Sequence, residues 1–566
     1  MKYSKTTTGQ SKKFLSLIAI SLALTMFAAS CGSDSADDVT STTAAPTTEA
    51  TTDTAAPTTA AAVVATACED GSHLEWALQQ TPDTLFAPTH FAVPEGGGLM
   101  GLVYDNLLVY TGEGDLVNGL AESWEATGPT TYVYTLREGV QFSDGTAVTP
   151  EDVKFSIDMQ SDETVASKGS FLFENVESVT VDGNDIIIEL IAPDSLWKFI
   201  PSHMMTFIVS QADVEANLAA YGTPEHFPLG SGPYMVTEFV PDSHISMERN
   251  PYYSGDEPVF DTLRFPIIPD PQTRFLAMQN GDIDGTFRVP SEALSQWEGI
   301  SEIASVPSFI FRGFTIDMDQ EPFDDIHVRR ALYYATNRDG IVTGLFPNQA
   351  ITAETLNDPA MFAGILPQDE VDAGYEAMEV FDFDLDKARE ELALSSVPDG
   401  FKMTINVPDG HAASDHLSQS VKDTWGQIGI EVELNVMPGG PRFQVILDHE
   451  PDLGVQLIGN LPDVPDPLLL LQLYYASDQA AAGGNNSSNL RDDAIDALIK
   501  TARESSDPVE AARLGLEIQQ LAAAQVPIIP VLWSDYKIAM TPGWSLASAN
   551  GFSMTHNFVA FIDPCG

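Results

Sequence analysis

The sequence predicts an α/β protein with two lobes, and three observations lead to this fold class. After the first 67 residues, strand-like and helix-like patterns alternate along the chain. About 500 residues follow that point, a length that corresponds to two or three domains. Hydrophobic residues make up 43% of the chain, which is enough to build a sizeable core. Because the chain returns repeatedly between strands and helices, we expect two α/β lobes.

The first 31 residues have the composition of a secretory signal. Four lysines precede a run of apolar and small residues over 14–30, and no acidic residue occurs before Asp34. A basic region, a short apolar core and small residues before a cut site are typical of an export signal. The run is shorter than the roughly 18 to 20 apolar residues that span a bilayer. We therefore expect export, and no other segment has the length and apolarity of a membrane span.

A lipid anchor and a tether are expected at the start of the mature chain. Residues 28–31, Ala-Ala-Ser-Cys, resemble a bacterial lipobox, which implies a diacylglyceryl group on Cys31. The usual Leu of that motif is Ala28 here, and a plain secreted protein is the alternative. Residues 32–67 are mostly Thr, Ala, Ser, Pro and acids, so we expect a disordered tether. Anchor and tether would hold the globular body at the outer face of the cytoplasmic membrane, or in the periplasm.

The two other cysteines lie at the ends of the exported body. Cys68 follows the tether, and Cys565 is the penultimate residue of the chain. An even number of cysteines in an oxidising compartment predicts a disulfide, and many domains bring their termini together. Two unpaired surface thiols are the alternative.

The charge is strongly acidic, with 82 Asp and Glu against 26 Lys and Arg, a formal net charge of −56. Such a surface repels phosphate, so nucleic acid is excluded as a partner. Attraction of cationic or amine-bearing solutes is one interpretation. Adaptation to salty surroundings is the other, and the spread of the acids over the whole length favours it.

The elements of the first half can be placed in order. Alternation of apolar and polar residues predicts strands at 73–78 and 132–137 and a hairpin around 175–191 with its turn at 182–184. Residues 96–98 form a Gly-rich, hinge-like stretch, and 143–145 form a turn. Thr149 as N-cap and Pro150 at the first helical position then open a helix. Two strands follow within 230–253, and a strand, a helix and a Gly-Asp-x-Asp turn lie within 260–285.

The second half continues the alternation. A strand is expected at 311–318, followed by a helix capped by Asp324 and Asp325, and its apolar face consists of Val328, Ala331, Leu332 and Ala335. An amphipathic helix at 385–394, a strand at 402–409, and a helix and strand over 414–437 come next. Two helices and a strand over 492–533 complete the body.

Several blocks of the chain resemble the family 5 extracellular solute-binding proteins, the peptide/nickel-type receptors of ABC importers. The main block is 102–157, where the signature positions are Leu120–Trp124, Leu136–Val140, Phe142, Asp144, Gly145, Thr149, Asp152, Val153, Phe155 and Ser156. Further blocks are 81–88, 230–253, 260–285 and 322–342; in the last, Asn337 replaces the usual Asp. The resemblance implies a monomeric, non-enzymatic receptor without a cofactor that binds a peptide or similar small solute for the permease subunits of an importer.

The resemblance also implies a type II periplasmic-binding-protein fold with an extra α+β domain and a ligand cleft between two lobes. The first lobe would be discontinuous, the extra domain would be inserted in it, and the second large lobe would follow. The expected boundaries are 68–90, 228–305 and 525–566 for lobe I, 91–227 for domain II, and 306–524 for lobe III. The Cys68–Cys565 bridge would then join lobe I to itself.

A ligand loop is expected within 456–473, which resembles the family's Gly-Trp-x-x-Asp-x-x-Asp-Pro loop. In peptide-binding members the first Asp pairs with the α-ammonium of the ligand, and that position is Asp463 here. Asp466 takes the second Asp position, and Asn460 replaces the Trp, which removes a stacking wall. A charge-assisted hydrogen bond to an ammonium fits a carboxylate in a closed cleft. The alternative is that Asp463 and Asp466 only cap the following helix.

Three further groups of residues are weaker candidates for a site. Arg288, beside the turn at 281–284, is a candidate contact for a ligand carboxylate, or it only balances nearby acids. Phe86 and Phe287 are candidate apolar walls, with core packing the favoured alternative. His411, Asp415 and His416 have a spacing that fits no known zinc pattern, so a surface loop is expected there and no metal site.

Two other classes of function are compatible with an exported chain of this length. An exported hydrolase is disfavoured because the sequence has no G-x-S-x-G, no H-E-x-x-H and no phosphate-binding loop. The cysteines of the mature chain lie at its ends, which argues against a thiol nucleophile. A sensory or adhesion module on the same fold remains the third possibility. The identity of the solute is not encoded in any motif, because specificity lies on variable loops.

Overall fold

The structure is a computed structural model that describes residues 72–89, 94–409, 412–450 and 453–564. The signal sequence, Cys31, the tether and the predicted disulfide between Cys68 and Cys565 lie outside the described residues. None of the described helices is long and apolar enough to cross a membrane.

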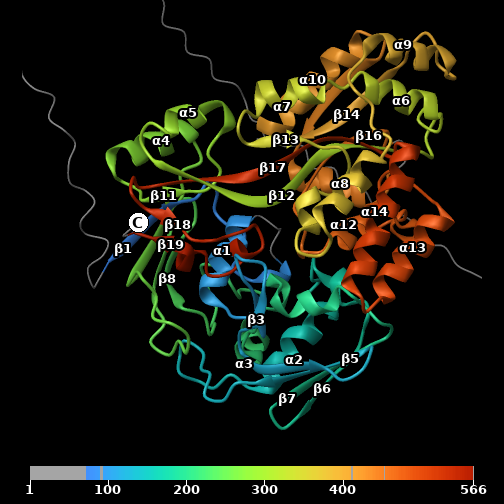
Figure 1. The fold of residues 1–566 in the computed structure, drawn as a ribbon. Helices are drawn as coiled ribbons and strands as arrows, with labels where there is room; N and C mark the ends of the chain where they lie inside the picture. The colour runs from blue at the N-terminus through green and yellow to red at the C-terminus, as the bar shows by residue number, and fades with distance from the viewer. Residues whose placement is uncertain (1–71, 90–93, 410–411, 451–452, 565–566) are drawn as a thin grey trace, which may run out of the picture. The chain divides into compact units, whose positions relative to one another are not determined.

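A nine-stranded mixed sheet forms the framework of the described chain (Figure 1). Its strands follow the order β16-β12-β17-β11-β1-β10-β9-β8, with β13 attached to β17. The bounds are β1 His73–Ala77, β8 Tyr234–Val240, β9 His244–Arg249, β10 Thr262–Pro266, β11 Gly285–Thr286, β12 Glu302–Ile316, β13 Ala350–Thr352, β16 Val455–Asn460 and β17 Ile528–Met540.

Two long antiparallel strands, β12 and β17, connect the two parts of this sheet. At one end, Met540 of β17 pairs with Gly285 of β11; in the middle of β17, Ser534 pairs with Ala350 of β13. The register of β12 against β17 shifts between Val306 and Ile310, where Phe309 has a left-handed φ of 54°. An ordinary side chain in that region is uncommon and costs free energy. The crossing strands are therefore irregular where they pass from one part of the sheet to the other.

Helices cover both faces of the sheet around β12 (Figure 1). Phe314 and Ile316 point into one hydrophobic core, and Phe311 points into another. The first core is built with α6 Ile326–Tyr334, α7 Arg338–Leu345, α9 Leu385–Leu394, α10 Ala412–Gly426 and the parallel pair β14 Lys402–Pro408 and β15 Glu431–Met437. The second includes α8 Gln368–Glu376, α12 Pro467–Tyr475, α13 Asp493–Glu504 and α14 Pro508–Gln525. Burial on both faces explains the apolar runs of these strands.

The remaining elements surround the other part of the sheet. A four-stranded antiparallel sheet has the order β4-β5-β7-β6, and β2 pairs with β3. The bounds are α1 Pro94–Val103, β2 Leu108–Tyr110, β3 Leu116–Asn118, β4 Ala121–Ala126, β5 Thr131–Leu136, α2 Pro150–Asp158, β6 Val176–Asp182, β7 Asp185–Leu190, α3 Gln211–Asn217, α4 Pro271–Asn280, α5 Leu294–Trp297, α11 Gly439–Leu447, β18 Ser545–Leu546 and β19 Ile562–Asp563.

The local signals for helix starts are confirmed with one exception. Thr149 caps α2, and the Asp152 carboxylate accepts the Thr149 backbone N–H at 2.9 Å, which completes a capping box. Asp325 caps α6 by accepting the His327 N–H at 2.9 Å, and Asn337 caps α7. Asp324 is the exception, since it contributes its backbone carbonyl, an acceptor for Arg329 at 3.0 Å, and no cap.

The expectation of a hinge-like stretch at 96–98 is wrong, because these glycines lie inside α1. Their role is close packing against the 3₁₀ turns of residues 553–561. A Cβ on Gly98 would lie 3.1 Å from the Met554 carbonyl oxygen, and one on Gly101 would lie 2.4 Å from backbone atoms of His556. Bare backbone therefore allows the C-terminal segment to lie directly on α1.

Substitution Gly101→Ala is expected to destabilise the fold by about 1–3 kcal/mol, because the new methyl group overlaps the His556 backbone. Gly344→Ala is the matched control: Gly344 is also helical, in α7, but its Cβ would meet nothing within 4 Å. That control should gain about 0.5–1 kcal/mol from helix propensity. Denaturant unfolding followed by tryptophan fluorescence measures both, and equal midpoints for the two variants would contradict the packing argument.

Candidate ligand site

The loop at 461–466 joins the end of β16 to the start of α12. Asn460, the last residue of β16, pairs with Phe311 of β12, so the loop starts where the crossing strands meet this part of the sheet. Asp466 is the N-cap of α12, and its carboxylate accepts the Leu468 N–H at 2.9 Å. Burial raises the pKa of Asp466, while that hydrogen bond opposes the rise. The capping alternative is therefore what the structure shows for Asp466.

Asp463 has no such role. Its side chain is 33% exposed, and no described residue hydrogen-bonds to its carboxylate. Burial raises the pKa of Asp463 to about 6. At neutral pH the group is therefore a carboxylate that is costly to bury and has no hydrogen-bond donor among the described residues.

His203 faces Asp463 from the segment that follows the four-stranded sheet. Its Nε2 lies 4.0 Å from Asp463 Oδ1, and its Nδ1 accepts the Met205 N–H at 3.2 Å. Burial, together with the nearby His556, lowers the pKa of His203 to about 4. His203 is thus neutral at pH 7 and does not neutralise the carboxylate. Nothing in the sequence around His203 marked it, because the contact joins segments 260 residues apart.

Asn460 lies three residues before Asp463. It is half-buried, and its side-chain amide makes no hydrogen bond with the described residues. The preceding Gly459 is exposed and pairs with Arg312 of β12. Asn460 and Asp463 therefore lie three residues apart at the end of β16 and in the loop after it, and the structure places His203 beside Asp463.

The other predicted contacts lie elsewhere. Phe86 is 1% exposed and packs on the Tyr221 ring at 5.1 Å. Phe287 is 5% exposed and packs between Trp76 and Phe558, with centroid distances of 5.2 and 5.0 Å. Both rings are engaged with protein, as the core-packing alternative anticipated.

Arg288 follows β11 at the junction of the sheet. Its φ of 53° is left-handed, and its Nη2 donates to the Tyr536 hydroxyl at 3.4 Å. The guanidinium also lies 5.8 Å from the Tyr536 ring. Tyr536 of β17 therefore orients the Arg288 side chain. In this position, beside the crossing strands β12 and β17, the guanidinium is suited to a polar contact.

The expectation of a surface loop at 411–416 is wrong for its described part. Asp415 and His416 lie in α10, whereas His411 is outside the described residues. The helix continues because Ser414 to Gly426 carries apolar residues at helical spacing, of which Leu417, Val421 and Trp425 are fully buried.

A cavity of about 640 Å³ lies between the 171–200 segment and helices α12 and α13. The connection at 461–466 contributes only Val464 to its wall, and Asp463 does not line it. An ion pair between Asp194 and Arg503 spans the same interface, and the Ser195 N–H donates to the Arg503 carbonyl at 2.8 Å. The cavity is therefore a groove beside the loop and is separate from the carboxylate of Asp463.

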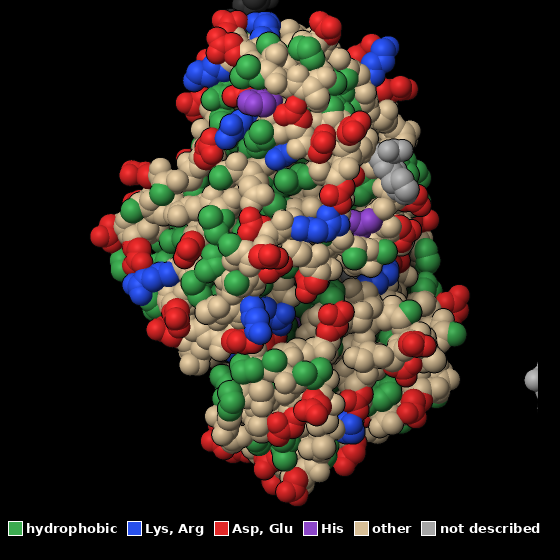
Figure 2. All heavy atoms as spheres, turned by 90° about the vertical axis from the view of Figure 1, so that its right-hand side faces the viewer, with side chains coloured by type: hydrophobic (Ala, Val, Ile, Leu, Met, Phe, Trp, Pro, Cys, Tyr) green, Lys and Arg blue, Asp and Glu red, His purple; other side chains and the backbone are tan. Residues whose placement is uncertain are grey.

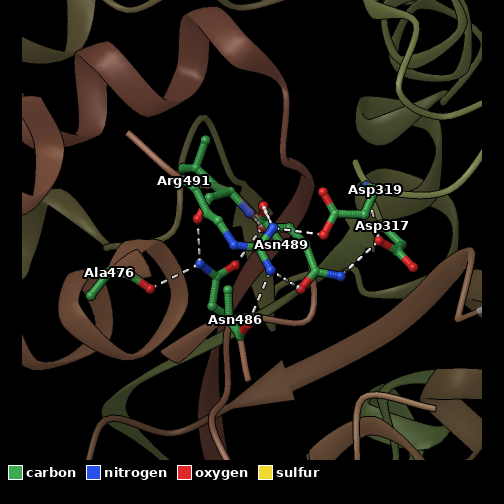
Figure 3. A network of polar contacts seen from close by, with 9 residues as sticks. Asp317, Asp319, Ala476, Asn486, Asn489 and Arg491 are labelled. Atoms are coloured by element: carbon green, nitrogen blue, oxygen red, sulfur yellow. Dashed lines mark hydrogen bonds and ion pairs between the residues drawn. The ribbon is translucent and has the colours of Figure 1, made fainter. Parts of the chain in front are cut away.

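A polar network fixes the C-terminal end of α12 (Figure 3). Arg491 pairs with Asp319 at 2.6 Å, and Asn489 Nδ2 donates to Asp317 at 2.8 Å. The buried Asn486 donates to the carbonyl oxygens of Ala476 at 3.0 Å and Leu490 at 2.9 Å. These contacts hold α12, and hence the ligand loop before it, against the end of β12.

Substitution Asn486→Ala is expected to cost about 1–3 kcal/mol, because the buried Leu490 carbonyl oxygen loses its donor and the Ala476 carbonyl oxygen keeps only the Gln479 N–H. Asn485→Ala is the matched control, since the Asn485 side chain makes no hydrogen bond with described residues. Unfolding midpoints of both variants check this expectation. If Asn485→Ala lowers the stability as much as Asn486→Ala does, the loss is not due to the hydrogen bonds of the network.

On the face that Figure 2 shows, acidic side chains are scattered from top to bottom and do not gather at one site, and basic groups are few. The distribution on this face matches the interpretation of the charge as a general surface property. Asp463 is distinguished by its lack of a hydrogen-bond partner among the described residues.

Comparison of the sequence with known proteins gives a family and a set of relatives. The family described as bacterial extracellular solute-binding proteins, family 5 Middle, matches residues 115–482. The glutathione-binding protein GsiB of Escherichia coli (strain K12) is 27% identical over 469 residues, which cover 80% of this chain and 87% of GsiB. GsiB of Shigella flexneri matches with the same identity and coverage.

Comparison with solved structures gives the fold. The periplasmic binding protein DppA from Helicobacter pylori, in complex with the peptide STSA, has a TM-score of 0.75 and 20% identity, covering 87% of this chain and 98% of DppA. The oligopeptide-binding protein AppA from Bacillus subtilis, in complex with a nonapeptide, has a TM-score of 0.74 and 21% identity, with the same coverage. The agropinic acid complex of AgaA from A. tumefacien R10 has a TM-score of 0.74 and 21% identity, again covering 87% and 98%. These likenesses confirm the predicted type II periplasmic-binding-protein fold.

Proposed function

Because the chain belongs to the bacterial extracellular solute-binding proteins of family 5, we propose that it is the substrate-binding component of an ABC importer. It captures a peptide or similar amine-bearing small solute between its lobes and delivers it to the permease subunits. The family match over 115–482 carries this proposal. The names of the relatives, which refer to glutathione, a peptide and agropinic acid, support a small solute with an amine or acid group.

The chemistry of the ligand loop supports an amine. Asp463 is a partly buried carboxylate without a hydrogen-bond donor among the described residues, and the neighbouring His203 is neutral at pH 7. An ammonium group placed there gains a charge-assisted hydrogen bond and removes the cost of the unpaired charge. Asn460 and Arg288 are proposed as further contacts, while Asp466 supports the loop as a helix cap.

The proposal includes the lobes, the anchor and the terminal bridge. Lobe I comprises 68–90, 228–305 and 525–566, domain II comprises 91–227, and lobe III comprises 306–524. Closure of the lobes about β12 and β17 over the solute is the signal for the transporter. A lipid on Cys31 keeps the monomeric receptor at the membrane, and a Cys68–Cys565 disulfide joins the ends of lobe I.

A thermal-shift screen of the exported body tests the proposal. Dipeptides, tripeptides, glutathione, opines, oligosaccharides and nickel chelates are added separately, and a ligand at a hundred times its Kd adds about 2.7 kcal/mol of stability. A shift with one amine-bearing class is expected. The absence of any shift across these classes would contradict the proposal.

Recovery of the ligand distinguishes a receptor from an exported hydrolase. The stabilising compound is incubated with the protein and analysed by mass spectrometry, and it should be recovered intact. A cleaved product would support the hydrolase. Cells that carry the matching permease and ATPase should also take up the solute. If the protein binds the solute but these cells do not take it up, the result would support a sensory module.

A further inference from the structure

Two 3₁₀ turns over residues 197–206 lie beside the loop that carries Asp463. An ion pair of Asp194 with Arg503 of α13 attaches the start of this segment to the helices that follow the loop. His203 lies between the two turns, and its Nε2 is 4.0 Å from Asp463 Oδ1. The imidazole therefore faces a carboxylate that has no hydrogen-bond donor among the described residues.

The position of His203 is fixed by its backbone and by its ring. Its N–H donates to the Ile200 carbonyl oxygen at 2.9 Å, and its carbonyl oxygen accepts the Asn106 Nδ2–H at 2.8 Å. The ring is held as well, because Nδ1 accepts the Met205 N–H at 3.2 Å. A shorter distance between His203 and Asp463 therefore requires movement of the loop, and the imidazole serves as a fixed partner.

The contact at Nδ1 determines which ring nitrogen of His203 carries the proton. A nitrogen that accepts a backbone N–H uses its lone pair, so the proton of the neutral ring is on Nε2. Burial, and secondly the nearby His556, lowers the pKa of His203 to about 4, so the ring is neutral at pH 7. Nε2 makes no hydrogen bond with a described residue, and its distance of 4.0 Å from Asp463 Oδ1 is about 1 Å longer than a hydrogen bond. His203 therefore holds an unused, uncharged donor in front of the carboxylate.

An uncharged donor suits an ammonium site better than a cation does. A Lys or Arg side chain beside Asp463 would neutralise the carboxylate and compete with the ammonium of the solute. A neutral N–H group binds one carboxylate oxygen, leaves the negative charge in place and fixes the orientation of the other oxygen. The imidazole of His203 meets this requirement at neutral pH.

We propose that His203 is a positioning residue of the ammonium site: as the solute binds, the loop moves Asp463 onto His203, whose Nε2–H donates to Oδ1 and leaves Oδ2 for the ammonium. This inference rests on the proposed function for the identity of the bound molecule. His203 belongs to the proposed domain II and Asp463 to lobe III, so the hydrogen bond makes domain II a direct participant in solute binding.

Substitutions of His203 by Asn and by Gln separate the roles of its two ring nitrogens. Asn places its oxygen near the Nδ1 position, where it can accept the Met205 N–H, but it does not reach the Nε2 position. Gln reaches the Nε2 position with an N–H donor and loses the contact with Met205. At pH 7.5, His203→Asn should lower the affinity for trialanine about tenfold, the typical effect of one hydrogen bond to a charged group, whereas His203→Gln should stay within about threefold of the wild type.

Calorimetric titration measures these affinities, and N-acetyl-trialanine, which lacks the ammonium, is the matched ligand. Its weaker binding should be the same in the wild type and both variants. A purely structural role of His203 predicts the opposite order, because Asn keeps the contact with the Met205 N–H and Gln does not. Wild-type affinity for trialanine in His203→Asn, or an equal loss in His203→Gln, would therefore overturn the assignment.

A second measurement does not depend on peptide binding. NMR spectroscopy with isotope-labelled histidine locates the ring proton of His203, whose signals are assigned by their absence from His203→Asn. The proton should be on Nε2, and methylammonium chloride should shift the Nε2–H signal in the wild type but not in Asp463→Asn, with sodium chloride at equal ionic strength as the control. A proton on Nδ1, or an Nε2–H signal that methylammonium leaves unchanged, would overturn the assignment. A methylammonium shift without any peptide binding would contradict the proposed function alone.

Discussion

The substitution Asp463→Asn is expected to lower the affinity for an amine-bearing solute about 100-fold. The change removes the negative charge but keeps the size and one oxygen of the side chain. Truncating one partner of a buried, hydrogen-bonded charge pair costs about 2–5 kcal/mol, and 100-fold corresponds to about 2.8 kcal/mol. Because the Asp463 carboxylate makes no hydrogen bond within the described chain, the loss should appear in binding and not in folding.

The matched control is Asp466→Asn, three residues along the same loop. Asp466 caps α12 through the Leu468 N–H, and Asn is as good an N-cap as Asp. Its affinity should stay within a factor of about three of the wild type. Calorimetric titration of both variants with the solute found by the thermal-shift screen provides the comparison. An equal loss in the two variants would mean that general acidity, and not Asp463, attracts the amine.

Features of the fold that depend on residues close together in the sequence were predictable, whereas those that depend on distant residues were not. Thr149 and Asp325 were identified as helix caps because a cap depends on residues within three positions along the chain. The hairpin turn at Gly183 was identified for the same reason. The glycines at 96–98 were misinterpreted, because their close contact with residues 554–558 joins segments more than 450 residues apart.

The candidate site was predictable only in part. The loop with Asp463 and Asp466 was found through its resemblance to a family motif, and the structure separated a cap from an unpartnered carboxylate. His203 carried no motif. Its position depends on the packing of distant segments, and an isolated His has no periodicity to mark it. Only the coordinates could bring it beside the loop.

Affinity for an amine-bearing solute is expected to fall about tenfold between pH 7.5 and pH 5.0. Burial raises the pKa of Asp463 to about 6 in the unliganded protein, and a protonated carboxyl group does not pair with an ammonium. Below pH 6 each pH unit therefore costs about a factor of ten, and above it the affinity is flat. The affinity measurements stop at pH 5.0, so that the pH stays above the isoelectric point of the chain, which is about 4.1.

Ionisation of the Asp463 carboxylate should also change the free energy of unfolding of the unliganded protein, in a direction that follows from its pKa. Between its unfolded pKa of about 3.9 and its folded pKa of about 6, the native state binds more protons, so Asp463 lowers stability as pH rises. His203 and His556 act in the opposite sense: their folded pKa values are lowered, and their contribution is lost as pH falls. Comparing the wild type with Asp463→Asn cancels the two histidines and isolates the carboxylate.

The Asp463→Asn variant should be more stable than the unliganded wild type at pH 7.5 by about 1 kcal/mol. A fully buried group would give about 3 kcal/mol, and the exposed third of the side chain reduces it. Near pH 5.0 the difference should be about half as large, because the native carboxyl is then mostly protonated. Glu138→Gln, an exposed position, shows the effect of removing one charge from a chain of net charge −56. A pH-independent gain equal to that of Glu138→Gln would mean that Asp463 is an ordinary surface acid, and the ammonium site would lose its physical basis.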